Sequence, residues 1–310
     1  MDIRHLRYFI AISEEPSLSA AAARLGVAQP SLSQHVINLE AELGVSLLSR
    51  SPRGVVLTED GHRLVRHARQ ICRSFDDCLA DMEAAGGAAR GTVALGLPPS
   101  ISMVLSVPLV ETVRVELPQV RLTAAEAMSG TIRGWLADQS IDIGFLYDLD
   151  PRDRFDAIHL LDESLCFFAS PEDWPFDTPP GQPLDLAQLA GKELILPSLG
   201  HGLRRMLAQA ANAAGVTLEV VIEMDAMTQI KELVARGSGY TILSPAAAHD
   251  FEQRGELVKS PIAGPLMTRP VYLVTNPARV MTNACRAIEA CTREVTVDLV
   301  RRGIWEGRLA

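Results

Sequence analysis

Uncharged polar side chains that can both donate and accept hydrogen bonds gather in one short stretch near the start of the chain, QPSLSQHVINLEAELG, residues 29–44. Pro30 suits the first turn of a helix, where its missing N–H is not needed. Apolar residues then recur at helical spacing, which predicts one buried stripe: Leu32, Val36, Leu39 and Leu43. The polar side chains fall on the opposite side and at the helix start: Gln29, Ser31, Ser33, Gln34, His35 and Asn38.

These residue types suit the reading of DNA bases. Gln and Asn pair a donor and an acceptor with the edge of adenine, Ser reaches bases or phosphates, and a helix N-terminus favours phosphate. A face rich in Lys and Arg binds any duplex, whereas a face of amides and hydroxyls can discriminate between sequences. We therefore interpret this helix as a DNA-recognition helix. The alternative is an ordinary helical hairpin with a solvated face.

The preceding residues predict the rest of a helix-turn-helix. Ser17 or Ser19 can cap a short helix that runs to Leu25, and Gly26 suits the turn. Leu6, Phe9 and Ile10 mark an earlier helix. This order of helix, tight turn and polar helix is typical of helix-turn-helix domains.

A small hairpin is expected next, in LLSRSPRGVVLTEDG, residues 47–61. Its turn carries Arg50 and Arg53, which suit contacts with the phosphate backbone or the minor groove. Thr58 can cap the helix that follows, with two carboxylates in the favourable first turn.

That helix, residues 59–85, has the most regular periodicity in the chain. Its heptad-like seam extends back to Gly61 and forward to Ala85, and contains Leu64, Ala68, Ile71, Phe75, Cys78 and Met82. A helix of this length spans about 40 Å, more than a small domain needs. We interpret it as a dimerisation helix that provides two recognition helices for a palindromic site. Packing on its own chain is the alternative. A Gly-rich hinge follows at residues 83–91.

Charge is distributed unevenly along the 310 residues. Residues 1–75 carry nine Arg against seven Asp and Glu, a net charge of +2, whereas residues 76–310 carry −11. A basic piece on an acidic body favours a polyanionic partner at one end. The apolar runs are too short for a membrane span and the N-terminal pattern lacks a signal-peptide core, so we expect a cytoplasmic protein with no membrane partner.

The stretch from Leu6 to Gly61 resembles the LysR-type transcriptional regulators, through the small-residue helix, VAQPSLS, LEAELGV, the arginine of the wing and LTEDG. The body resembles, less specifically, members that control nitrogen assimilation, through ELPQVRLTAAEAMSGT. The family often has a basic residue where Gln34 and Asn38 stand, and their neutral side chains imply weaker non-specific attraction to phosphate. The resemblance implies double-stranded DNA as a partner, a contact with RNA polymerase, and a homodimer that assembles into a homotetramer.

The resemblance also implies an α/β multidomain fold. We expect a winged helix-turn-helix at residues 1–58, a linker helix and hinge at 59–90, and an effector-binding domain at 91–310 that resembles periplasmic binding proteins. Its first lobe would comprise about 91–162 and 269–310, and its second about 163–268. The pattern alone predicts alternating strands and helices, with strands near 92–97, 120–127, 141–147, 164–170, 193–197, 218–224 and 269–276, hence a parallel sheet in the first lobe.

Ligands of such sheets bind beyond the carboxyl ends of the strands, at helix N-termini. Several strand-to-helix turns here carry hydroxyls or glycine, which suits an anionic or carbonyl-bearing small molecule. The candidate effector-binding residues are Ser100, Ser102, Ser129, Gly130, Tyr147, His201 and Thr228, with Arg204 as a further charge. The alternative is that each Ser and Thr only caps its helix.

The main alternative to a DNA-binding regulator is an enzyme. The sequence has no G-x-S-x-G, P-loop or H-E-x-x-H motif, and its seven His show no metal-ligand spacing, so we expect no catalytic residues, metal or cofactor. A solute-binding module would leave the first 90 or so residues unexplained. The five cysteines have no C-x-x-C pair and are expected to be reduced and buried, with redox sensing by Cys72 and Cys78 or by Cys285 and Cys291 as the alternative.

Overall fold

A computed structural model describes residues 1–51, 54–83, 89–199, 201–264 and 267–310 of the chain. Within these ranges the chain divides into two compact units, Met1–Gly87 and Ala88–Ala310, and each is described here by itself. No helix of the described residues combines the length and the apolar character that crossing a membrane requires.

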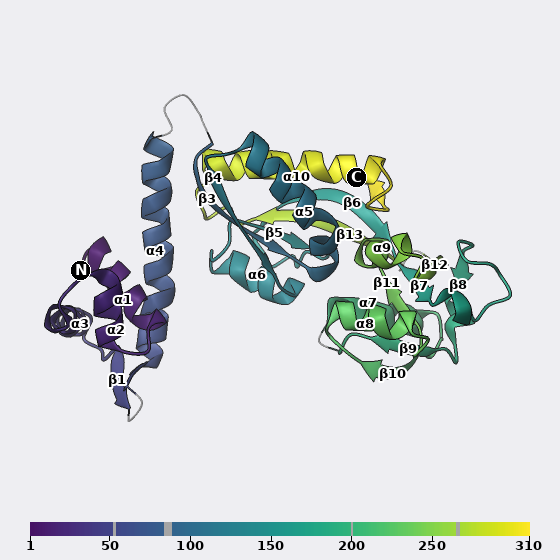
Figure 1. Ribbon diagram of the computed structural model, residues 1–310, viewed down its shortest axis with the longest axis horizontal. Coiled ribbons are helices and arrows are strands. Elements are labelled where there is room, and N and C mark those ends of the chain that lie inside the picture. The colour runs from purple at the N-terminus through teal and green to yellow at the C-terminus, as the bar shows by residue number, and fades with distance from the viewer. Residues whose placement is uncertain (52–53, 84–88, 200, 265–266) are drawn as a thin grey trace. The chain divides into compact units, whose positions relative to one another are not determined.

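The first unit is a winged helix-turn-helix followed by a long helix (Figure 1). Its elements are α1 (Ile3–Glu14), α2 (Leu18–Leu25), α3 (Gln29–Leu43), the antiparallel pair β1 (Leu48–Ser51) and β2 (Gly54–Leu57), and α4 (Glu59–Glu83). The order and type of these elements confirm the sequence prediction.

Local chemistry fixes where these helices begin. Ser17 Oγ accepts a hydrogen bond from Ala20 N at 3.1 Å, and Thr58 Oγ1 accepts one from Gly61 N at 3.0 Å, as the predicted caps should. Gly26 ends α2 in the left-handed region with a φ of 67°. At Gly61 a Cβ would lie 2.2 Å from the carbonyl oxygen of Leu47, so only glycine lets α4 start this close to the wing.

The apolar stripe of α3 is confirmed for three of its four residues. Leu32, Val36 and Leu39 are buried, and they join α3 to α1 and α2. Leu43 is exposed, so that part of the prediction was wrong. Leu43 is the last residue of α3, directly before the Gly44 cap, where the helix ends.

The long helix α4 divides into two halves. In the first half Val65, Ala68 and Cys72 are buried, and they pack with residues of α1. In the second half the apolar side chains are exposed: Ile71, Phe75, Leu79 and Met82. The predicted seam is therefore partly wrong, since Ala68 packs on the protein's own chain, whereas the seam residues Ile71, Phe75, Cys78 and Met82 are exposed. Ala85 lies outside the described residues.

The second unit has two lobes (Figure 1). Lobe I is built on a six-stranded sheet of order β14-β6-β13-β5-β3-β4, in which β3 runs parallel to β4 and β5 while β13 runs antiparallel to β5 and β6. Its elements are β3 (Gly91–Leu97), α5 (Pro99–Glu116), β4 (Val120–Glu126), α6 (Ser129–Ala137), β5 (Ile143–Leu146), β6 (Asp156–Ser164), β13 (Thr268–Thr275), α10 (Asn283–Arg301) and β14 (Arg308–Leu309). Helices α5 and α10 cover one face of the sheet and α6 the other.

Lobe II has a four-stranded sheet of order β11-β7-β12-β8 and a parallel pair β10-β9, with one core between its helices and strands. Its elements are β7 (Cys166–Ala169), the 3₁₀ turns Pro171–Asp173 and Leu186–Leu189, β8 (Leu184–Asp185), β9 (Glu193–Leu196), α7 (Gly202–Ala213), β10 (Glu219–Glu223), α8 (Met227–Ala235), β11 (Thr241–Leu243), α9 (Pro245–Gln253) and β12 (Val258–Ala263).

The chain crosses between the lobes twice, from β6 to β7 and from β12 to β13. Backbone hydrogen bonds of Leu165, in the first crossing, join it to the second. Its N–H donates to Met267 O at 2.7 Å, and its carbonyl oxygen accepts from Ile262 N at 3.0 Å. The sequence pattern predicts no strand at β6, because the residues of β6 show no clean alternation of apolar and polar side chains.

Close packing of α6 on the sheet leads to a stability prediction. A Cβ on Gly144 of β5 would lie 2.7 Å from Ile132 Cγ2 of α6, whereas a Cβ on Gly134 within α6 meets nothing within 4 Å. We expect Gly144→Ala to lower the free energy of unfolding by about 1–3 kcal/mol through overpacking. The matched control Gly134→Ala is expected to raise it by about 0.5–1 kcal/mol, because alanine loses less entropy in a helix. Urea unfolding followed by circular dichroism compares them, and equal shifts would contradict the packing described here.

Candidate DNA interface and effector cleft

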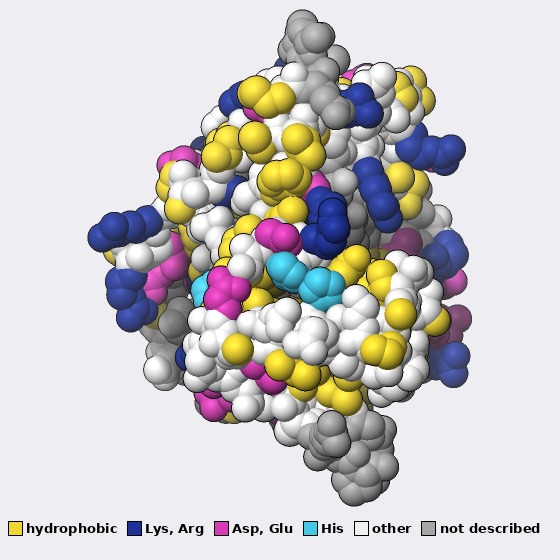
Figure 2. All heavy atoms as spheres, turned by 90° about the vertical axis from the view of Figure 1, so that its left-hand side faces the viewer, with side chains coloured by type: hydrophobic (Ala, Val, Ile, Leu, Met, Phe, Trp, Pro, Cys, Tyr) yellow, Lys and Arg dark blue, Asp and Glu magenta, His cyan; other side chains and the backbone are white. Residues whose placement is uncertain are grey.

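The exposed face of α3 is uncharged over most of its length. Gln29, Pro30, Ser31, Gln34 and Asn38 are exposed, and Ser33 is half-buried. Figure 2 looks at the side of the first unit on which α3 lies. Acidic and basic side chains lie beside the His side chains at its centre, and the surface below them is mostly uncharged. The structure thus brings the predicted amides and hydroxyls onto one surface.

Side chains four residues apart pair along this face. Gln29 Nε2 donates to Ser33 Oγ at 2.8 Å, and Gln34 Nε2 donates to Asn38 Oδ1 at 2.9 Å. Each glutamine amide therefore engages an N–H in its pair. Such pairs hold long side chains in place before a ligand arrives, which lowers the entropy lost on binding.

His35 differs from the other predicted contact residues. Its ring lies 4.8 Å from the ring of His5 and 5.3 Å from that of Tyr8, both on α1, and it is half-buried. His35 thus sits at the border between the α3 face and α1. The wing carries Arg50 on β1, while Arg53 lies outside the described residues.

A cleft of about 580 Å³ lies between the two lobes of the second unit. On one wall is the first turn of α6, with Ser129, Gly130 and Thr131, and on the other is the start of α7, with His201 and Gly202. The first N–H groups of a helix have no acceptor within the helix, so both walls present donors. Apolar surface comes from Met128, Leu203, Met206 and Pro270.

Three arginines line the same cleft. Arg133 on α6 donates to Asp148 Oδ1 at 2.7 Å and also pairs with Asp153. Arg205 lies one turn into α7 and is exposed. Arg269 comes from the crossing strand β13 and is buried. The sequence pattern predicts none of these three. The prediction of Arg204 was wrong, because Arg204 does not line the cleft and instead approaches Glu223, with 3.9 Å between Nη2 and Oε1.

His201 is held in one orientation. Its Nδ1 accepts a hydrogen bond from Leu203 N at 3.1 Å as the cap of α7. Burial lowers the pKa of His201, and the positive charge of Arg269 lowers it further. The imidazole is therefore neutral at pH 7, and because Nδ1 is the acceptor, Nε2 carries the proton and is a donor.

Behind the cleft a buried network surrounds Arg269. Its Nε donates to Glu163 Oε2 at 2.8 Å, and its Nη2 donates to Ser100 Oγ at 3.2 Å and Ser244 Oγ at 3.0 Å. The guanidinium lies 3.7 Å from the centre of the Tyr147 ring, and Tyr147 Oη lies 2.5 Å from Ser100 Oγ. Burial raises the pKa of Tyr147 well above its usual range, so its hydroxyl stays neutral.

The predicted effector residues thus fall into three groups. Ser129, Gly130, Tyr147 and His201 line the cleft, and Ser100 lies in the layer directly behind it. Ser102 does not reach the cleft, because it bonds Ser106 Oγ at 2.9 Å along α5. Thr228 does not either, because α8 buries Ile230 and Val234 in the lobe II core and so turns Thr228 to solvent.

The cysteines of the second unit lie outside the cleft lining and are buried: Cys166, Cys285 and Cys291. Burial raises the pKa of the Cys166 thiol to about 12 and that of Cys291 to about 11. Since the thiolate is the reactive form, these two thiols are unreactive at neutral pH.

Comparison with known proteins agrees with both units. The family described as "LysR substrate binding domain" matches residues 86–296, and "Bacterial regulatory helix-turn-helix protein, lysR family" matches residues 3–62. The nitrogen assimilation regulatory protein nac of Klebsiella aerogenes is 30% identical over 99% of this chain and 98% of its own. The dual regulator OxyR of Escherichia coli K12 is 29% identical over 89% of this chain and 90% of its own.

Solved structures show the same fold. CbnR complexed with its target DNA superposes with a TM-score of 0.71 at 22% identity, over 96% of this chain and 99% of that one. A full-length OxyR variant of Pseudomonas aeruginosa gives a TM-score of 0.72 at 22% identity, over 96% and 97%. The relatives named here are regulators and not enzymes. With a helix-turn-helix at one end, an effector-binding domain over more than half of its length and relatives of this kind, the chain belongs to the LysR family of DNA-binding transcriptional regulators.

Proposed function

We propose that this regulator reads operator DNA with paired α3 helices and responds to a small anionic metabolite bound between the lobes of its second unit. One observation carries the effector proposal, namely that two helix N-termini, α6 and α7, line the same cleft of about 580 Å³. That volume is within the range of small-molecule sites.

The cleft chemistry favours a compact anion such as a carboxylate with an apolar body. Backbone N–H groups at Ser129 and Gly130, the Nε2–H of His201 and the guanidinium of Arg205 are all donors, and helix N-termini favour negative charge. Met128, Leu203 and Met206 supply apolar contact on the remaining surface. Arg133 is already neutralised by Asp148 and Asp153, so we assign it to holding the wall in place.

The alternative function is peroxide sensing, because some relatives are named hydrogen peroxide-inducible genes activators. The thiols of the second unit argue against that assignment. In the first unit Cys78 is exposed, so the prediction that all five cysteines are buried was wrong for this one. Cys166 and Cys291 are buried with raised pKa values, and no cysteine of the described residues lines the cleft. A cleft of donors fits a bound anion better than a thiol reaction.

For assembly, we infer a dimer formed through the second half of α4, which assembles further into a tetramer. The exposed apolar side chains Ile71, Phe75, Leu79 and Met82 recur along one helix, and an exposed apolar patch of this kind marks an interaction site. Two such chains present two α3 helices to a palindromic operator. Effector binding changes the preferred arrangement of the lobes, and through it the pairing of dimers, the bend of the DNA and the contact with RNA polymerase.

The proposed base-reading role of α3 predicts that substitutions on its polar face lower the affinity for operator DNA more than the affinity for random DNA. Gln29→Ala and Ser33→Ala are each expected to weaken operator binding by about 1–3 kcal/mol, because each removes one partner of a base-directed pair. Affinity for random duplex should change much less. Fluorescence anisotropy with operator and scrambled duplexes measures both.

Arg53→Ala is the comparison variant, since the sequence assigns Arg53 to phosphate contact. It should weaken binding to every duplex and reduce the slope of log affinity against log salt by about 1. If Gln29→Ala and Ser33→Ala lower both affinities equally, α3 does not read bases.

The dimer proposal predicts that a charge on the exposed seam of α4 separates the chains. Leu79→Asp should shift the protein toward a smaller species in analytical ultracentrifugation, because it buries a carboxylate in an apolar interface. Operator affinity should fall with it, since a single α3 reads only half a site. Val280→Asp replaces an equally apolar exposed residue away from α4 and should leave the assembly unchanged. An unchanged sedimentation coefficient for Leu79→Asp would argue that α4 does not join the chains.

The cleft proposal predicts that a negative charge at the start of α6 prevents ligand binding, whereas the same charge at the start of α8 does not. A thermal-shift screen of small carboxylates and phosphates on the full chain should yield a ligand that raises the melting temperature. Ser129→Asp should abolish that shift, because it places a carboxylate among the donors of the cleft. Thr228→Asp puts the same charge in the first turn of α8, outside the cleft, and should retain the shift. Retention by both variants would place the effector elsewhere.

A further inference from the structure

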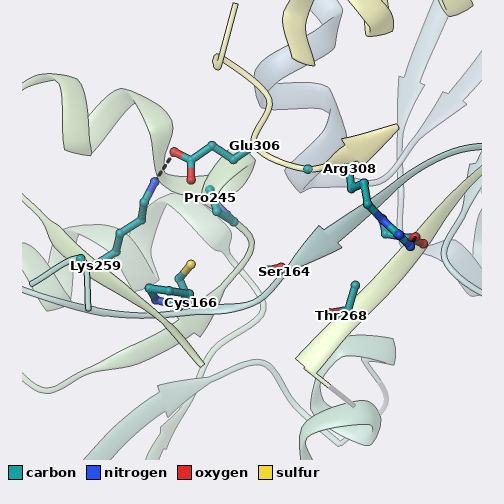
Figure 3. A pocket seen from close by; sticks show the side chains of 11 residues that line it. Ser164, Cys166, Pro245, Lys259, Thr268, Glu306 and Arg308 are labelled. Atoms are coloured by element: carbon teal, nitrogen blue, oxygen red, sulfur yellow. Dashed lines mark hydrogen bonds and ion pairs between the residues drawn. The ribbon is translucent and has the colours of Figure 1, made fainter. Parts of the chain in front are cut away.

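A second cavity, of about 640 Å³, lies beside the two crossings between the lobes (Figure 3). It is lined from both lobes, by Asp162, Ser164 and Thr268 on the strands of lobe I and by Lys259 on β12 of lobe II. The segment after α10, which carries Glu306 and Arg308, completes it. Nothing in the proposed function uses this cavity.

One side of the cavity holds a mostly buried ammonium. The Lys259 side chain is 17% exposed, and its Nζ lies 2.9 Å from Glu252 Oε1 within lobe II. Glu306 of lobe I forms a second ion pair with the same Nζ, drawn as the dashed line in Figure 3. The Glu306 side chain is 48% exposed, so its carboxylate contacts Lys259 from the solvent side of the cavity.

The other side holds a mostly buried carboxylate. The Asp162 side chain is 19% exposed, and it accepts hydrogen bonds from His159 Nε2 at 2.9 Å and Arg308 Nη2 at 3.1 Å. The Arg308 side chain is 86% exposed. Thus Asp162, like Lys259, has one partner beside it and one that approaches from solvent.

The two solvent-side partners come from one short segment and carry opposite charges. Glu306 and Arg308 are two residues apart, and they bring a carboxylate to Lys259 and a guanidinium to Asp162. Figure 3 shows the Lys259–Glu306 pair on one side of the cavity and Arg308 on the other, with Ser164 between them. Ser164 and Thr268, which are register partners on β6 and β13, add hydroxyls, while Pro245 and Pro261 add apolar wall.

We propose that this cavity is a second small-molecule site and that its ligand is a zwitterion, with an ammonium group and a carboxylate separated by a short chain. The ligand carboxylate pairs with Lys259 and the ligand ammonium with Asp162, and in doing so they displace Glu306 and Arg308. The exchange is possible because Glu306 and Arg308 are the exposed members of their pairs, so that their charged groups return to water when the ligand displaces them. A ligand with only a carboxylate or only an amine displaces only Glu306 or only Arg308, and it therefore binds more weakly.

The site also connects the lobes. The Lys259–Glu306 pair joins β12 of lobe II to the segment after α10 in lobe I. A zwitterion between Lys259 and Asp162 replaces this link with one of different length. Occupancy of the cavity therefore changes the relative stability of lobe arrangements, and with it the affinity of any ligand held in the cleft.

Isothermal titration of the full chain tests the proposal with ω-amino acids of two, four and six carbons, glycine, 4-aminobutyrate and 6-aminohexanoate. Each is compared with the carboxylate and the amine of equal length. We expect one of the three to bind about tenfold more tightly than both of its analogues, because only it satisfies both charges. Glu306→Gln should tighten that binding, since it removes the competing carboxylate from Lys259 while leaving the cavity intact.

Lys259→Met should abolish binding. Because that change leaves Glu252 without its cation, the double variant Glu252→Gln/Lys259→Met tests the same loss without an unpaired buried carboxylate. Lys192→Met, which removes a lysine beside Phe176 elsewhere in lobe II, should bind normally. Ser129→Asp should also bind normally, which separates this site from the cleft.

Three results would overturn the proposal. The first is that none of the ω-amino acids binds either the wild-type protein or Glu306→Gln. The second is that the double variant binds as the wild type does. The third is that the carboxylate of equal length binds as tightly as its amino acid, which would leave Asp162 without a role.

Discussion

A buried ion pair between Glu163 and Arg269 holds the two crossing strands of the second unit in register. These residues face each other across β6 and β13, and both are almost inaccessible to water. Removing one member of such a pair costs about 3–5 kcal/mol, because the other charge is left unpaired in a medium of low polarity. The remaining groups of the pair are also occupied, since Trp305 Nε1 donates to Glu163 Oε1 at 2.6 Å.

This arrangement explains why one arginine touches so many elements. Arg269 contacts α5 through Ser100, α9 through Ser244 and the end of β5 through the ring of Tyr147. Ser244 belongs to lobe II and Ser100 to lobe I, so the guanidinium connects the lobes at their junction. A guanidinium suits this position because it presents five donors in a fixed plane and stacks on an aromatic ring. Any ligand in the cleft rests against a wall whose atoms are already fixed.

Much of the first unit was predictable because its signals are local. The caps Ser17 and Thr58, the turn at Gly26 and the polar face of α3 each depend on residues within one or two helical turns. The prediction failed where tertiary packing decides. Leu43 has the spacing of a buried residue but is exposed at the last position of α3, and Ala68 has the spacing of an intermolecular seam but packs on α1.

In the second unit, the sequence pattern predicts the alternation of strands and helices and four of the cleft residues. It does not predict which charged residues are buried or line the cleft. Glu163 and Arg269 look like surface residues in sequence, since their burial depends on meeting each other from positions 106 residues apart. The choice between Arg204 and Arg205 depends on the rotational phase of α7, which shifts by about 100° per residue. A sequence pattern predicts helix ends only to within a few residues, so the rotational phase of α7 could not be predicted.

The two-residue strand β14 has a consequence for the solubility of the folded chain. It covers the outer side of β6, to which it is paired through Arg308 and Leu309, and so ends the six-stranded sheet in a very short edge. At the opposite border, β4 presents the charged side chains Arg121 and Glu126 to solvent. Brief or charged borders discourage a foreign strand from joining a sheet. The largest sheet of this protein is thereby protected at both margins against edge-to-edge aggregation.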